Sequence, residues 1–172
     1  LRPNFLSIRN IFNLITQASI YGILALGMLL VIVSKGIDLS VGSVLAFAGV
    51  VAGSLGQTMD AFDRMFPGLP ELPIIVPIIV ALLLGALCGA INGGLIAYTG
   101  VPAFIATLGM FTAARGAALM YTGGKPISSI NHSITIFGSR IFNVIPVPVI
   151  IYGIMIIITF IIMNYSKFGK SV

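Results

Sequence analysis

The sequence predicts an all-α membrane protein, a polytopic bundle of about five transmembrane helices. Of its 172 residues, 58% are hydrophobic and only 8% are charged, and the mean hydropathy is +1.15. Soluble domains carry about 25% charged residues, so this chain has too few to cover a water-facing surface. The charged residues also leave uninterrupted apolar runs that suit helices of about 20 residues, the length that crosses the hydrocarbon core of a bilayer.

The predicted helices follow these runs in chain order. The first run lies between Arg9 and Lys35, and the second ends before Asp60. The third run, 72–114, has the length of two helices, and we divide it near Gly100 and Pro102 because glycine and proline interrupt helices. The predicted spans are 11–33, 40–58, 73–98, 102–121 and 147–163, within a single transmembrane domain over 1–172.

The composition excludes several other classes of protein. The net charge of +5 arises from 9 basic and 4 acidic residues, and the basic residues are scattered, which argues against a nucleic-acid partner. A single cysteine, Cys88, and a single histidine, His132, are too few for a disulfide within the chain or for a multi-histidine metal site. We therefore expect this chain to bind no metal and no cofactor.

Catalytic motifs are also absent from the sequence. It contains no phosphate-binding loop of the G-x-x-x-x-G-K-[ST] type, no H-E-x-x-H, no G-x-S-x-G and no pair of carboxylates within a predicted span. A membrane-bound enzyme would need a nucleophile and a base, and no such pair is recognisable. The sequence therefore predicts a protein that does not make or break bonds.

Small residues recur every four positions in two predicted spans. Gly49 and Gly53 lie in the second span, and Gly85, Gly89 and Gly93 lie in the third. Such stripes allow helix backbones to approach closely in a bilayer, where apolar surface alone gives no drive to associate. They predict helix packing, and a surface that slides during transport is the alternative.

The segment 34–43 between the first two spans concentrates polar and small residues. Either Asp38 or Ser40 can cap the first turn of the second helix and so satisfy amides that lipid would leave unpaired. The alternative is direct contact of this segment with a transported solute or ion.

Two polar residues lie within the later spans. Arg115 interrupts the fourth span, and an ionisable residue there indicates a bundle interior or a water-filled cavity, with snorkelling to the interface as the alternative. Asn92, in the third span, either lines a polar path or makes an interhelical hydrogen bond.

A series of short motifs runs through the whole chain in order. The most specific is the octapeptide at 36–43, Gly-Ile-Asp-Leu-Ser-Val-Gly-Ser. The others are Pro-Asn-Phe-Leu-Ser at 3–7, Ala-Leu-Gly-Met at 25–28, Asn-Gly-Gly-Leu-Ile-Ala at 92–97, Pro-Ala-Phe-Ile-Ala-Thr-Leu-Gly-Met at 102–110, Arg-Gly at 115–116, Tyr-Thr-Gly-Gly-Lys-Pro-Ile at 121–127, Ile-Pro-Val-Pro at 145–148 and Phe-Gly at 168–169. Together these residues resemble the permease subunits of monosaccharide (ribose-type) ABC importers.

The resemblance implies a larger assembly. Permeases of this family have about ten helices, so the chain corresponds to the N-terminal half without the first helix. They lie in the bacterial cytoplasmic (inner) membrane and work as homo- or heterodimers with a periplasmic or lipid-anchored sugar-binding protein. Two ATPase subunits bind ATP and magnesium. The resemblance also implies that the loops 57–72 and 122–146 face outward, an orientation that charge counting leaves open.

The resemblance implies the import of a monosaccharide, a ribose-like pentose or a hexose. On this basis we expect Asp38, Ser40, Asn92 and Arg115 to line or gate the translocation path. An ion-gradient-driven secondary transporter or channel for a small polar solute is the alternative function. The spans contain no carboxylate suited to a proton relay, which argues against that alternative.

Overall fold

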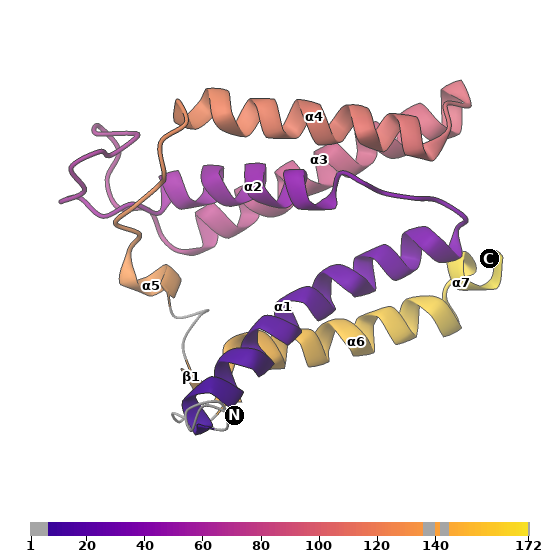
Figure 1. Cartoon of the computed structure of the whole chain (residues 1–172), viewed down its shortest axis with the longest axis horizontal. Helices are drawn as coiled ribbons and strands as arrows, with labels where there is room; N and C mark the ends of the chain where they lie inside the picture. Colours follow the sequence, from indigo (N-terminus) through magenta and orange to yellow (C-terminus); the bar gives the residue numbers. More distant parts are fainter. Residues whose placement is uncertain (1–6, 136–139, 142–144, 172) are drawn as a thin grey trace. The chain divides into compact units, whose positions relative to one another are not determined.

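The chain is helical over most of its length (Figure 1). The computed structural model describes residues 7–135, 140–141 and 145–171. The long helices are α1 (Ile8–Val33), α2 (Val41–Leu55), α3 (Ile75–Thr99), α4 (Ala103–Thr122) and α6 (Val147–Tyr165). The shorter described elements are helices α5 (His132–Thr135) and α7 (Lys167–Ser171) and the antiparallel strands β1 (Arg140–Ile141) and β2 (Ile145–Pro146).

The predicted helical membrane bundle is confirmed. Helices α1, α3, α4 and α6 are each long and apolar enough to cross a membrane, and α2 is a shorter apolar helix. Burial is inverted relative to a soluble domain, where large aliphatic residues fill the core. Here Leu82 and Leu83 are 68% and 63% exposed. The buried polar residues of the described chain are Ser19, Ser40, Ser43, Ser54, Gln57, Asn92, Thr107 and Thr159.

The second helix differs most from its prediction. It covers Val41–Leu55 rather than 40–58, because the Gly56 amide closes the helix with bonds of 3.1 Å to the carbonyls of Ala52 and Gly53. A helix of 15 residues is about 22 Å long, short of the roughly 30 Å of a hydrocarbon core. The other long helices agree with their predicted spans more closely. At the start of α1, Ser7 accepts a hydrogen bond from the Asn10 amide at 3.3 Å, and the helix begins three residues before the predicted position.

The described helices belong to two compact units, Gly36–Thr135 and the combination of Leu1–Lys35 with Ile136–Val172. In the first of these, α2 and α4 run in the same direction and α3 runs opposite to them (Figure 1). Ser40 at the start of α2 contacts Asn92 late in α3, whereas Ser54 at the end of α2 contacts Tyr121 at the end of α4. These directions agree with three successive membrane crossings.

In the other unit, α1 and α6 lie side by side and run in the same direction. Gly22 of α1 faces the ring of Tyr152 in α6, and further along Leu30 and Val31 share a cavity with Ile162. A side chain at position 22 would collide with Tyr152, since a Cβ atom built there lies 2.6 Å from the ring. The absence of a side chain at Gly22 therefore sets the approach of the two helices.

Replacing Gly22 by alanine is expected to destabilise the α1–α6 pair by about 1–3 kcal/mol, the usual cost of overpacking a close contact. The melting temperature of the full-length protein in detergent measures this effect. The double variant Gly22→Ala with Tyr152→Ala provides the control, because removing the ring removes the collision. If Gly22→Ala lowers the melting temperature by the same amount in the wild type and in a Tyr152→Ala background, the proposed contact is contradicted.

In the unit Gly36–Thr135, hydrogen bonds join two loops at the end opposite the start of α2. Gln57 is 2% exposed, and both ends of its amide are used: Nε2 donates to the Ser128 carbonyl at 3.1 Å and Oε1 accepts from the Met65 amide at 2.9 Å. The Thr58 amide also donates to the Ser129 carbonyl at 2.9 Å. Gln57 therefore connects the loop after α2 with the loop after α4.

Candidate functional site

The chain enters α2 through a segment without regular secondary structure, residues 36–40. The carboxylate oxygen Oδ1 of Asp38 accepts two hydrogen bonds from Ser40, from the amide at 2.7 Å and from the hydroxyl at 2.6 Å. Ser40 is 1% exposed, and its side chain makes no bond to the first amides of α2. The cap bond predicted for Ser40 is thus not formed, and Asp38 bonds the Ser40 amide, which comes one residue before the first amide of α2.

This segment lies beside the interiors of α3 and α4, away from their ends. The Asn92 amide nitrogen Nδ2 donates to the Ser40 hydroxyl at 3.2 Å, and Asn92 lies seven residues before the end of α3, about 10 Å along its axis. The Thr107 hydroxyl donates to the Ile37 carbonyl at 3.2 Å, and Thr107 lies one turn inside the start of α4. Helix α2 therefore begins about one to two helical turns inward from the ends of α3 and α4 that lie nearest to it.

Non-helical backbone at membrane depth is tolerated only where its polar groups have partners or line a cavity. Here the bonds from Asn92 and Thr107 and the internal Asp38–Ser40 pair supply partners. The negative charge of Asp38 also lies at the positive end of the α2 dipole, which is a favourable position. The polar segment thus forms a hydrogen-bonded break at the start of α2.

One atom of this network is left over. The carbonyl oxygen Oδ1 of Asn92 is buried and has no hydrogen-bond partner among the described residues. Asp38, Ser40 and Asn92 line one end of a groove between α2 and α3 with a volume of about 520 Å³. The rest of the groove is lined by small and aliphatic side chains.

The glycines predicted to pack helices border this groove or lie near it. Gly49, Gly85 and Gly89 line it, and a Cβ atom built on any of these or on Gly93 would meet nothing within 4 Å among the described atoms. Gly53 differs, since a Cβ atom there would touch Ile127 at 3.4 Å. The described atoms of this unit do not cover Gly49, Gly85, Gly89 or Gly93. The packing of another helix against these four glycines therefore stays a prediction.

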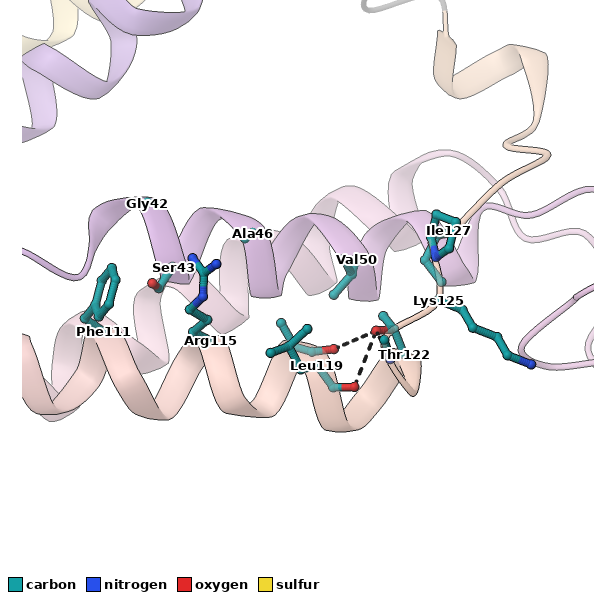
Figure 2. A pocket seen from close by; sticks show the side chains of 13 residues that line it. Gly42, Ser43, Ala46, Val50, Phe111, Arg115, Leu119, Thr122, Lys125 and Ile127 are labelled. Carbon is teal, nitrogen blue, oxygen red and sulfur yellow. Dashed lines mark hydrogen bonds between the residues drawn. The ribbon is translucent and has the colours of Figure 1, made fainter.

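Arg115 lies in a different groove, between α2 and α4. This groove has a volume of about 650 Å³ and is also lined by Ser43 and Phe111 (Figure 2). Arg115 lies seven residues before the end of α4, about 10 Å along the axis, so its position is within the span. Arg115 is exposed along this groove, and both alternatives predicted for it, a cavity and snorkelling to the interface, stay open.

The four residues predicted to line a path are thus divided between two grooves on either side of α2. Asp38, Ser40 and Asn92 are joined by hydrogen bonds, and Arg115 is separate from them. The four path residues predicted from the sequence did not include Ser43 or Thr107. Ser43 lines the groove between α2 and α4, and the Thr107 hydroxyl donates to the backbone of the segment before α2. Both are single hydroxyls in apolar helices, and only their burial distinguishes them. No group of three or more His, Cys, Asp or Glu side chains that could hold a metal occurs in the described residues.

Comparison with known proteins assigns the chain to a family. Residues 10–172 match the family described as branched-chain amino acid transport system / permease component. Ribose import permease protein RbsC of Bacillus subtilis (strain 168) is 42% identical over 173 residues, which cover 99% of this chain and 50% of that protein. Ribose import permease protein RbsC of Escherichia coli (strain K12) is 38% identical over 177 residues, covering 100% of this chain and 51% of that protein.

A galactose relative is similar over the same extent. Galactose/methyl galactoside import permease protein MglC of Haemophilus influenzae (strain ATCC 51907 / DSM 11121 / KW20 / Rd) is 33% identical over 177 residues, covering 99% of this chain and 53% of that protein. No solved structure gives a significant match. The chain spans about half the length of the curated relatives it matches. The resemblance to sugar import permeases and the predicted membrane location are confirmed, and the chain belongs to the branched-chain amino acid transport system / permease component family.

Proposed function

We propose that the chain is part of the membrane-spanning permease of an ATP-binding-cassette importer that moves a monosaccharide across the bacterial cytoplasmic membrane. The observation that carries the proposal is the match, over nearly the whole chain, to import permeases for ribose and for galactose. The polar break at the start of α2 and the cavity beside Arg115 support it, because a polar solute needs polar groups at membrane depth.

The proposal includes partners that the chain itself does not contain. ATPase subunits would bind ATP with magnesium and hydrolyse it, a sugar-binding protein would deliver the solute, and a second permease subunit would complete the path. This chain would bind no cofactor. Its own contribution is the path, for which we propose Asp38, Ser40, Asn92 and Arg115 as lining or gating residues.

Uptake measurements test this function in cells with and without the full-length gene. The panel contains labelled ribose, galactose and xylose, together with leucine, because the family description names branched-chain amino acids. We expect deletion to abolish uptake of one sugar, and we expect that uptake to stop on ATP depletion and to continue when the proton gradient is collapsed.

Two results would overturn the proposal. Uptake that follows the proton gradient instead of ATP would indicate a secondary transporter. Loss of leucine uptake with all sugar uptake intact would assign the chain to amino-acid import. The deletion strain complemented with the gene on a plasmid serves as the control for effects on neighbouring genes.

A further inference from the structure

The groove between α2 and α4 contains a buried hydroxyl that lacks a partner. Ser43, the third residue of α2, is 4% exposed, and its Oγ atom has no hydrogen-bond partner among the described residues. Serine hydroxyls inside helices usually donate to a carbonyl in the preceding turn, as Ser54 does to Val51 at 2.8 Å. Ser43 makes no such bond to the carbonyl of Ser40, three residues before it. Its hydroxyl is therefore available to a group in the groove.

Arg115 reaches the same end of the groove from α4. Its side chain extends toward α2, and its guanidinium lies beside Ser43 (Figure 2). No Asp or Glu is among the described residues that line the groove. Arginine has five N–H donors and no acceptor, and a charge within a span is stable only with acceptors or water around it. The N–H donors of Arg115 are therefore open to oxygen atoms of water or of a solute in the groove.

Phe111 completes the cluster. It lies one helical turn before Arg115 on α4, and its ring flanks Ser43 on the side away from the guanidinium (Figure 2). The three side chains thus present a hydroxyl, a fork of donors and an apolar ring face around one space. Small-molecule sites combine apolar walls with a few convergent polar groups in volumes of about 300–1,000 Å³, and this groove has about 650 Å³.

We infer that Ser43, Phe111 and Arg115 form a contact site for a neutral, hydroxyl-rich solute, a monosaccharide, in the groove between α2 and α4. The inference rests on the proposed function and assigns its solute contact to one of the two grooves. Hydroxyl oxygens accept from Arg115, a hydroxyl group pairs with Ser43, and C–H groups of a sugar ring face Phe111.

A neutral solute fits this site better than an anion. The positive end of α2 is already offset by the carboxylate of Asp38, which caps Ser40. The other cation that lines the groove, Lys125, extends away from Arg115 and does not converge with it (Figure 2). A single guanidinium without a second cation or a free helix terminus suits hydrogen bonding to hydroxyl groups.

The groove between α2 and α3 then has a different role. Asp38 and Asn92 both bond to Ser40 there, and Asn92 Oδ1 is buried without a partner among the described residues. In this assignment Asp38, Ser40 and Asn92 are positioning residues, which hold the start of α2 where Ser43 faces Arg115.

The first test substitutes Arg115 in the full-length gene and measures uptake of ribose and of galactose. Arg115→Met keeps the length of the side chain and removes its donors, and we expect it to lower uptake by about tenfold or more, as for a lost hydrogen bond to a charged group. Arg115→Lys keeps a donor and is expected to retain more uptake. Immunoblots of membranes correct each value for the amount of protein. Uptake by Arg115→Met equal to wild type would overturn the inference.

The second test compares the two grooves by cysteine modification. In a background with Cys88→Ala and any other cysteine of the full-length protein replaced, Ser43→Cys is matched with Ala86→Cys, which lines the groove between α2 and α3. Right-side-out and inside-out vesicles are treated with the water-soluble reagent methanethiosulfonate ethylsulfonate. We expect modification to block sugar uptake by Ser43→Cys, and uptake by Ala86→Cys to be unchanged.

The outcomes separate the two proposals. If wild-type vesicles with ATP take up none of the sugars of the panel, ribose, galactose and xylose, both the proposed function and this inference fail. If the wild type takes up one sugar, but treated Ser43→Cys keeps full uptake, the inference fails and the proposed function stands. Blockage at Ala86→Cys alone would move the solute to the groove between α2 and α3 and would likewise overturn the inference.

Discussion

Replacing Asp38 by alanine is expected to lower the stability of the full-length protein by about 3 kcal/mol. The reason is that the Ser40 amide and hydroxyl both donate to Asp38 Oδ1, and alanine offers neither of them an acceptor. Ser40 is almost fully buried, so water does not replace the lost partner. The midpoint of thermal unfolding in detergent measures the change, and the amount of protein in the membrane gives a second readout.

Asp38→Asn is the matched control for this variant. Asparagine keeps an oxygen in the position that Ser40 uses and removes only the negative charge. We expect it to unfold close to the wild type, lower by the loss of a favourable charge at a helix N-terminus, about 0.3–1 kcal/mol. An Asp38→Ala protein that unfolds and transports like the wild type would show that the break at the start of α2 does not depend on this carboxylate.

The second large effect is expected at Gln57. Replacing it by leucine leaves the Met65 amide and the Ser128 carbonyl without the partners that now hold the two loops together. The loop after α2 contains Arg64, which is a site for trypsin, whereas Lys125 in the loop after α4 precedes Pro126 and is not one. We expect the initial rate of trypsin cleavage at Arg64 to rise about tenfold or more, because a loss of 1–3 kcal/mol increases the population of the opened loops.

The control for Gln57→Leu is Ser128→Ala. This variant keeps the Ser128 carbonyl that accepts from Gln57 and removes only the exposed hydroxyl that donates to Asp63 at 3.0 Å. Its cleavage rate is expected to stay near that of the wild type, since an exposed hydrogen bond contributes little. Equal rates for Gln57→Leu and wild type would mean that the backbone bonds of the loops suffice without the glutamine side chain.

The sequence predicted the number and order of the long helices well, because that information is local. Charge-free runs and the Gly100–Pro102 interruption are enough to separate five apolar helices. The ends of α2 were harder to place. Residues 56–58 are as compatible with a helix as with a turn when considered alone, and the choice is made by contacts with residues 128–131, about seventy positions later in the chain.

The candidate site was predicted only in part for a similar reason. Asp38, Ser40 and Asn92 stood out as polar residues in apolar surroundings, but their pairing depends on the contact between α2 and α3. The separation of Arg115 from them depends on which sides of α2 face α3 and α4. Ser43 belongs to the motif at 36–43 and Ser54 does not, but the sequence does not show that the Ser43 hydroxyl is unpaired while that of Ser54 bonds to Tyr121 at 2.7 Å.

The short length of α2 bears on how the chain enters the membrane during synthesis. A helix of 15 residues leaves several ångströms of hydrocarbon to be crossed by the segment before it. The groups that bond this segment, Asn92 and Thr107, are synthesised later, in α3 and α4. The hydrogen bonds that hold the start of α2 to α3 and α4 therefore form only after these two later helices have been synthesised.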